Sequence, residues 1–184
     1  TSKSDKFRAT ADAQELATAD VIILCVPTPL GEHGEPDMSY IKQSTDMVAK
    51  VLRKGQLVTL ESTTYPGTTR GDCVPILAET GLAVGRDYFV AYSPEREDPG
   101  RKDHSTKTIP KLVGGVDEVS GQLATMLYSA AIAEVVPVES AEIGESAKLL
   151  ENIYRCVNIA LVNELKPVLS SMEIDIWKVV DAAK

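Results

Sequence analysis

Hydrophobic residues in the first three-quarters of the chain gather in short runs rich in β-branched residues. These runs lie at 19–27, 56–62, 88–92, 111–115 and 133–138, and each ends at Pro, Gly or polar residues. Continuous apolar runs of this length are typical of strands that are buried on both faces of a sheet. We therefore expect five buried strands.

Between these runs the apolar residues recur every three or four positions, which is the period of a helix. Helices are expected between the runs at about 39–53, 70–80 and 120–130, and Gly55 and Gly81 follow the ends of the first two. A short helix with a Thr or Asp start is expected before the first run, at about 10–17. Strands that alternate with helices through short connections predict an α/β fold with a doubly wound parallel sheet. Ligands of such sheets bind beyond the carboxyl ends of the strands.

The last segment has a different pattern, with apolar residues stepping by three or four from Ile143 to Val168. This predicts one long amphipathic helix of about 28 residues, roughly 42 Å in length. Pro167 lies near its end, and a further helix is expected to begin at 170–177. A helix of this length exceeds what one small sheet can cover, so it should connect to another domain or pack on a second subunit.

Charge and cysteine content narrow the class of protein. The formal net charge of -8 disfavours nucleic acid and anionic membranes as partners. No run approaches the roughly 18 apolar residues of a membrane span, and the polar start at 1–6 predicts no secretory leader. The three cysteines share no metal-ligand spacing, which favours a cytoplasmic protein without disulfides and without a zinc site.

Five motifs follow the predicted elements. They are CVPTPL at 25–30, ESTTYPGTT at 61–69, SPER at 93–96 with DPG at 98–100, KLVGG at 111–115, and ESAK at 145–148 continuing through Asn152 to NE at 163–164. In order and spacing they resemble the UDP-glucose/GDP-mannose dehydrogenase family over nearly the whole chain. The resemblance implies a partial Rossmann-like doubly wound parallel sheet followed by a long central helix.

Two parts of that family are not found in the sequence. The GxGxxG loop that cradles the cofactor pyrophosphate is absent, since the pair Gly114-Gly115 lacks the spacing, and so is the nucleophilic Cys of a later loop. We therefore interpret the chain as an internal piece. Residues 1–138 would form the second half of an NAD-binding domain, and residues 139–184 the start of a central helical dimerisation domain. Alone, the chain is not expected to bind NAD tightly or to complete the reaction.

The resemblance also implies an activity. Family members oxidise the C6 alcohol of a nucleotide sugar with NAD in two hydride transfers, through an aldehyde and a thioester that water hydrolyses. A UDP-sugar substrate and a homodimer through the long helix follow from the same resemblance. Such chemistry needs an oxyanion stabiliser and groups that manage protons.

Lys148 and Asn152 match the family's catalytic pair, and their spacing of four places both on one helix face. An ammonium and an amide side by side suit a developing alkoxide. From spacing alone, a solvated helix face is the better explanation, because Lys and Asn are usually exposed. Glu95 matches the family's catalytic Glu, although a carboxylate after a strand can also serve a helix N-terminus.

Thr63 matches a threonine that can hydrogen-bond the catalytic water or the Glu, and its alternative is a helix cap. Pro27 and Thr28 match the loop along the nicotinamide half of the cofactor, where Pro could also simply end a strand. Cofactor contacts are thus expected from Pro27, Thr28, Thr63 and Glu95.

The remaining nucleophiles and imidazoles are interpreted as structural. Cys156, one turn beyond Asn152, is taken as a small core residue, and Cys25 and Cys73 as packing residues. His33 and His104 have no second ligand at metal spacing, so no metal site is expected.

The residues after Glu95 decide the expected substrate. Arg96 and the DPG at 98–100 resemble the N-acetylhexosamine branch, which favours UDP-N-acetylglucosamine. UDP-glucose, UDP-N-acetylmannosamine and GDP-mannose remain alternatives, as does a non-catalytic assembly module built on the long helix.

Overall fold

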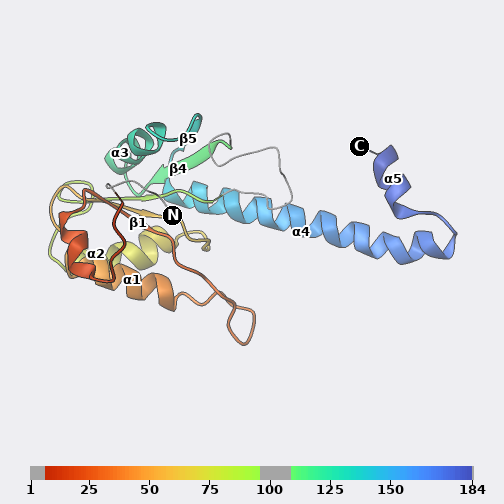
Figure 1. Cartoon of the computed structure of the whole chain (residues 1–184), viewed down its shortest axis with the longest axis horizontal. Coiled ribbons are helices and arrows are strands. Elements are labelled where there is room, and N and C mark those ends of the chain that lie inside the picture. Colours follow the sequence, from red (N-terminus) through yellow and green to blue (C-terminus); the bar gives the residue numbers. More distant parts are fainter. Residues whose placement is uncertain (1–6, 96–108, 184) are drawn as a thin grey trace. The chain divides into compact units, whose positions relative to one another are not determined.

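A five-stranded sheet organises the first part of the chain (Figure 1). The structure is a computed structural model and describes residues 7–95 and 109–183. The strands lie side by side in chain order: β1 (Val21–Leu24), β2 (Leu57–Leu60), β3 (Phe89–Tyr92), β4 (Lys111–Gly115) and β5 (Val135–Val138). Helical segment η1 (Ala13–Thr18) precedes β1. The helical segments between the strands are α1 (Ser39–Ala49), η2 (Thr69–Cys73), α2 (Val74–Ala78) and α3 (Glu118–Ser129).

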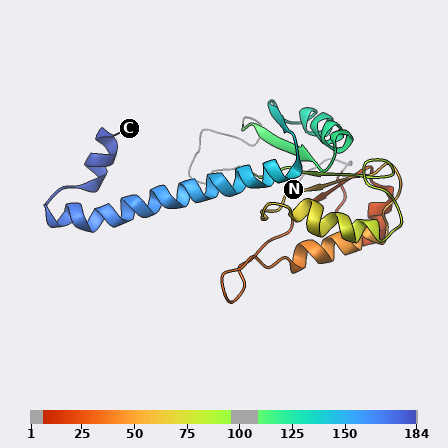
Figure 2. The same ribbon diagram turned by 180° about the vertical axis from the view of Figure 1, so that it is seen from behind.

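Both faces of the sheet are covered, as the apolar runs predict. Helices α1 and α2 lie on one face and α3 on the other (Figures 1 and 2). Alternate strand residues enter two separate cores: Val58 and Leu60 join the cluster under α1 and α2, whereas Leu57 joins the cluster under α3. The predicted α/β, doubly wound architecture is therefore confirmed.

One strand pairing departs from the expected parallel sheet. β1–β2, β2–β3 and β4–β5 are parallel, but β4 runs antiparallel to β3 with Tyr92 opposite Gly114. A parallel return needs a crossover, usually a helix. The sequence between these two strands has no helical period, and its residues 96–108 lie outside the described part. The reversal brings Lys111, the first residue of β4, to the carboxyl edge of β2 and β3.

Helix ends agree with local capping chemistry. The Asp12 carboxylate accepts a hydrogen bond from the Gln14 amide at 2.9 Å and starts η1, and Asp117 accepts one from the Ser120 amide at 2.9 Å and starts α3. Helix α1 ends at Ala49 and not at Arg53 as expected. The Arg53 amide instead donates to the Gln56 side chain at 2.8 Å, which holds the turn before β2.

The long C-terminal helix is α4 (Ala141–Ser171), and α5 (Ile176–Ala182) follows it. With 31 residues, α4 is slightly longer than expected and contains Pro167. It also runs through the position where the next helix was expected to begin, since α5 starts only after its cap Asp175. The chain divides into two compact units, Thr1–Lys148 and Leu149–Lys184.

The start of α4 is not held by its apolar stripe. Its buried residues are Ala141, Gly144 and Glu145, whereas Ile143 is 43% exposed. A Cβ on Gly144 would lie 3.1 Å from the Tyr92 ring, so the small residue permits a close approach of α4 to β3. A face of small residues and one carboxylate therefore fixes the first turns.

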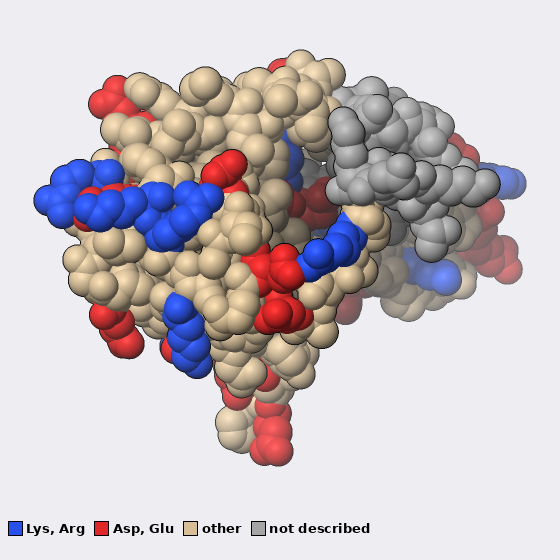
Figure 3. Space-filling view, turned by 60° about the vertical axis from the view of Figure 1, so that its left-hand side comes forward, with Lys and Arg blue, Asp and Glu red and all other residues tan. Residues whose placement is uncertain are grey.

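Surface charge is mixed despite the negative total. Figure 3 shows Lys and Arg side chains beside Asp and Glu on the same face. Among the helices that the structure describes, none combines the length and the apolarity that crossing a bilayer requires.

Candidate active site

Three loops begin together at the carboxyl edge of β1, β2 and β3. The strand register pairs Leu24 with Leu60 and Leu60 with Tyr92. Pro27, Thr63 and Glu95 each follow three residues after one of these paired positions. Because parallel strands end at the same edge, the loops that carry most of the predicted site residues start there.

Hydroxyl groups join the first two loops. The Ser62 hydroxyl donates to the Val26 carbonyl at 2.7 Å and accepts from the Val26 amide at 2.9 Å. The Thr28 hydroxyl donates to the Thr63 carbonyl at 2.9 Å. The predicted residues Thr28 and Thr63 are thus neighbours, and the Thr63 side chain is exposed at this edge. Ser62 was not singled out from the sequence, where it was one hydroxyl among several.

Lys148 and Glu95 also meet at this edge. The Lys148 ammonium of α4 donates to the Glu95 backbone carbonyl. Glu95 is exposed, and the Ser93 amide two residues before it donates to the Leu60 carbonyl at 3.0 Å, which ties the loop to β2. Asn152 lies four residues farther along α4, in the second compact unit. Arg96 and 98–100 lie outside the described residues.

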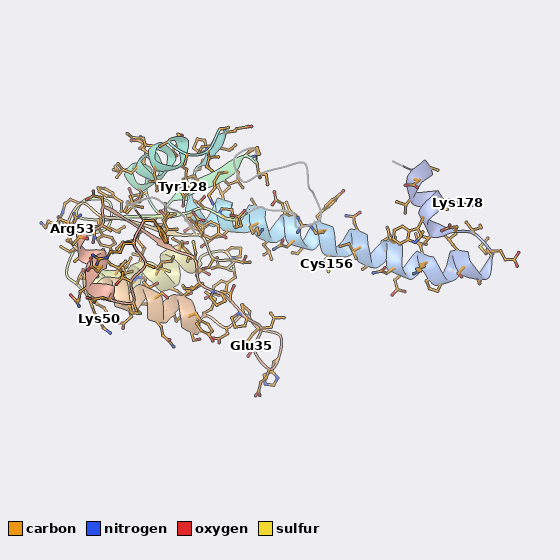
Figure 4. The ribbon with its side chains drawn as sticks, viewed as in Figure 1. Glu35, Lys50, Arg53, Tyr128, Cys156 and Lys178 are labelled. Carbon is orange, nitrogen blue, oxygen red and sulfur yellow. The ribbon has the colours of Figure 1, made fainter. Side chains whose placement is uncertain are left out.

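A charged cluster that the sequence analysis missed lies beside these loops. Lys111 Nζ is 3.2 Å from a Glu61 carboxylate oxygen, and the two side chains are 10% and 16% exposed. The hydroxyl of Tyr128 on α3 (labelled in Figure 4) donates to the same carboxylate. Lys111 Nζ lies 5.0 Å from the centre of the Tyr128 ring. Burial and the Glu61 carboxylate raise the pKa of Tyr128, so it remains a hydrogen-bond donor. No local pattern signals this cluster, because three elements supply it.

Glu145 is the second feature that sequence reasoning passed over. It is fully buried. Its carboxylate accepts hydrogen bonds from the Gly67 amide at 2.5 Å, the Thr69 amide at 2.8 Å and the Thr69 hydroxyl at 2.7 Å. The motif ESAK contained this residue, but a Glu on a long helix is ordinarily exposed. Its spacing from the small residues Ala141 and Gly144 was the available signal.

The cysteines fall into two classes, and two interpretations need correction. Cys73 is buried, as expected, and burial raises the pKa of its thiol to about 11. Cys25 is exposed because β1 ends one residue earlier, and Cys156 is exposed on α4 (Figure 4), so neither is a core residue of this chain. His33 lies in the loop closed by the Leu30–Pro36 bridge, and His104 lies outside the described residues.

Comparison with protein families identifies the two parts of this chain. Residues 1–132 match the NAD binding domain of the UDP-glucose/GDP-mannose dehydrogenase family, and residues 141–184 match the central domain of that family. The chain belongs to the UDP-glucose/GDP-mannose dehydrogenase family. The resemblance carried by the five motifs is thereby confirmed, as is the NAD cofactor expected for the first domain.

Relatives within this dehydrogenase family include the UDP-N-acetyl-D-glucosamine 6-dehydrogenase of Pseudomonas aeruginosa. It is 41% identical, and the match covers 98% of this chain and 43% of that protein. Among solved structures, a UDP-D-ManNAc dehydrogenase from Pyrococcus horikoshii superposes with a TM-score of 0.88 at 35% identity, over 95% of this chain and 41% of that one. The chain spans less than half the length of either dehydrogenase.

The edge fits part of the dinucleotide that the dehydrogenase domain implies. Exposed Pro27, the Thr28 hydroxyl and exposed Thr63 offer apolar contact and hydrogen bonds where a parallel sheet binds its ligand. The Gly-rich pyrophosphate loop is not among the residues of this chain.

Proposed function

We propose that the protein containing this chain is an NAD-dependent nucleotide-sugar 6-dehydrogenase. It would oxidise the C6 alcohol of a UDP-N-acetylhexosamine, with UDP-N-acetylglucosamine preferred, to the uronic acid. The observation that carries this proposal is the hydrogen bond from the Lys148 ammonium to the Glu95 carbonyl. It joins two predicted catalytic residues that are 53 positions apart in the sequence.

The proposed reaction removes two hydrides from C6 and adds one water oxygen. NAD, when bound, supplies the hydride acceptor. Lys148 would hold its ammonium against the alkoxide that develops on the C6 oxygen, and Asn152 would add an amide donor. The Glu95 carboxylate would take a proton from water in the hydrolytic step, with the Thr63 hydroxyl orienting that water. Pro27 and Thr28 would lie against the nicotinamide half of the cofactor.

Substrate preference rests on the relatives and on the motif after Glu95. The Pseudomonas aeruginosa protein named UDP-N-acetyl-D-glucosamine 6-dehydrogenase and a Salmonella typhi protein of the same name are 41% and 38% identical to this chain. A UDP-N-acetyl-D-mannosamine dehydrogenase of Pyrococcus horikoshii is 35% identical. For this reason we propose that the substrate is a UDP-N-acetylhexosamine. We also propose that the enzyme acts in the cytoplasm, as the cysteine content favours. The proposed division remains an NAD-binding part at 1–138 and a central part from 139.

The decisive experiment follows NADH formation by the complete enzyme with UDP-N-acetylglucosamine, UDP-N-acetylmannosamine, UDP-glucose and GDP-mannose. The highest kcat/KM is expected with UDP-N-acetylglucosamine. Lys148→Ala should lower kcat by about 10²-fold, the scale for losing an oxyanion donor. Lys50→Ala is the matched control, because Lys50 pairs with Asp46 on the exposed side of α1. NADH formation that is equal in the parent enzyme and in Lys148→Ala would refute the assigned role.

A second candidate function is assembly, favoured by the exposed apolar stripe of α4. Leu150, Tyr154, Val157 and Leu161 are each more than half exposed. We propose that this stripe forms a homodimer interface. Concentration-dependent dimerisation without turnover of any of the four sugars would favour an assembly module over an enzyme.

A further inference from the structure

We propose that Glu145 is a positioning residue that sets the place of Lys148 at the carboxyl edge of the sheet. This inference rests on the proposed function, because it assigns Glu145 a part in the work of the proposed catalytic lysine. Glu145 and Lys148 are three residues apart on α4, so they lie on one face of the helix, one turn from each other.

The contacts of Glu145 hold the first turns of α4 against the loop after β2. The carboxylate is fully buried and accepts three hydrogen bonds, two from backbone amides and one from a hydroxyl. A buried carboxylate is unfavourable unless its oxygens are fully hydrogen-bonded, so its position tolerates little displacement. All three donors belong to the loop after β2, at the start of η2.

The loop side of the contact is equally constrained. Gly67 has φ +97, which glycine adopts without strain, and this conformation presents its amide to Glu145. The Gly71 amide donates to the Gly67 carbonyl at 2.7 Å, so the donors are part of the first turn of η2. Four residues before Gly67 in the same loop is Thr63. The carboxylate therefore fixes α4 to the loop that carries another predicted site residue.

A second contact joins the same two segments but is exposed. Arg70 Nε donates to a Glu142 carboxylate oxygen at 2.5 Å, with side-chain exposures of 52% and 33%. Exposed pairs contribute little to position or stability. Glu142 therefore offers a matched control one turn earlier on the same helix.

The test is a double-mutant cycle in the complete enzyme. Glu145→Gln keeps the side-chain shape but replaces one acceptor oxygen by an NH2 group that faces an amide donor. We expect kcat to fall roughly tenfold, which is less than the roughly 10²-fold that a misplacement of about 1 Å can cost, while KM for NAD stays within about twofold. In a Lys148→Ala background the same change should lower kcat by less than about twofold. Glu142→Gln should change kcat by less than about twofold in either background.

The accessibility of the Lys148 ammonium can also be measured without enzyme turnover. Limited acylation by an amine-reactive ester, mapped by peptide mass, should modify Lys148 several-fold faster in Glu145→Gln than in the parent and leave Lys50 unchanged. If the parent protein oxidises no nucleotide sugar but this acceleration is seen, the proposed function fails and the positioning role stands. Equal kcat losses with and without Lys148, or unchanged Lys148 acylation, would overturn the positioning role.

A milder variant covers the case in which Glu145→Gln does not fold. Thr69→Val removes only the hydroxyl donor and leaves both backbone donors in place. It should lower kcat by a smaller factor, and Thr69→Ser should restore it because the hydroxyl returns. A loss of activity that serine does not restore would contradict the proposed role of the carboxylate's hydrogen bonds.

Discussion

The carboxylate of the single residue Asp87 is contacted by three donors, which hold the turn before β3. The carboxylate accepts from the Arg86 guanidinium at 2.8 Å and the Ala83 amide at 3.0 Å, and Lys54 Nζ lies 3.1 Å away. These partners, first the Arg86 hydrogen bond, hold the pKa of Asp87 well below its usual range. The side chain is 8% exposed, although both cations are mostly exposed.

A pH prediction follows from that lowered pKa. A carboxyl whose pKa is lower in the folded state stabilises the fold above its unfolded pKa of about 3.9 and loses this contribution as the pH falls below it. Asp87→Asn should therefore lower Tm by a few degrees at pH 7, and the gap to the parent should narrow progressively below about pH 4. Thermal unfolding monitored by circular dichroism between pH 3 and pH 7 measures this gap.

Asp46→Asn is the matched control for this experiment. Asp46 pairs with Lys50 at 2.6 Å, but the two side chains are 51% and 67% exposed. Such pairs contribute little, so Tm should stay within about a degree of the parent value at every pH. A gap for Asp87→Asn that does not change with pH would contradict the assignment.

Strand β4 and helix α3 pack backbone against backbone at Gly115. A Cβ on Gly115 would lie 2.2 Å from the Gly121 amide nitrogen and 2.4 Å from the Asp117 carbonyl oxygen. Backbone cannot move aside as a flexible side chain can. Gly115→Ala should therefore destabilise the protein by about 1–3 kcal/mol.

Chemical denaturation measures this prediction, with Gly71→Ala as its control. A Cβ on Gly71 would meet nothing within 4 Å, and the residue lies within η2. Alanine there should leave stability unchanged or raise it by about 0.5 kcal/mol. Equal losses from both variants would show that the close approach at Gly115 is not responsible.

Elements were predictable from the sequence where the pattern is local. The five strands and the helices between them follow from apolar runs and helical spacing, and β4 was expected at its observed bounds. The antiparallel direction of β4 was not predictable, because strand direction depends on contacts between distant segments. The pair Gly114-Gly115 was expected at the end of a strand and was rejected as a phosphate loop, but its close approach to Ser140 and Gly121 was not foreseen.

Some residues of the candidate site were predictable from the sequence and others were not. Pro27, Thr28, Thr63, Glu95 and Lys148 follow motifs that could be recognised along the chain. Glu145, Glu61 and Lys111 each begin one of these motifs, but their burial and pairing were not predicted, since both depend on elements that meet only in the folded protein. Residue type predicts exposure for each of them, and tertiary packing overrides it.

The exposed apolar stripe of α4 bears on the oligomeric state of the protein. Leu150, Tyr154, Val157 and Leu161 recur at steps of three or four, so they lie on one side of the helix. If the stripe forms the proposed dimer interface, Val157→Glu should weaken dimerisation by tenfold or more, because a charge would be buried at its centre. Sedimentation velocity over a concentration series measures the dissociation constant.

Lys166→Glu is the control for that measurement. Position 166 lies about 140° around the helix from Leu161 at 100° per residue, and so outside the stripe. This variant should dimerise as the parent does. A monomeric parent, or equal weakening by both variants, would remove the proposed interface.

The three hydrogen bonds of Glu145 have a consequence for synthesis on the ribosome. Their donors at Gly67 and Thr69 precede the acceptor by 78 and 76 residues. At about 5–20 residues per second, the loop after β2 waits roughly 4–16 seconds before its acceptor has been made. β1 and β2 are made before that interval and β3 early within it, but the loop has no carboxylate partner until Glu145 is made. The contact between this loop and α4 therefore forms only after the first turns of α4 have left the ribosome, and a pause in synthesis before residue 145 would prolong the interval without it.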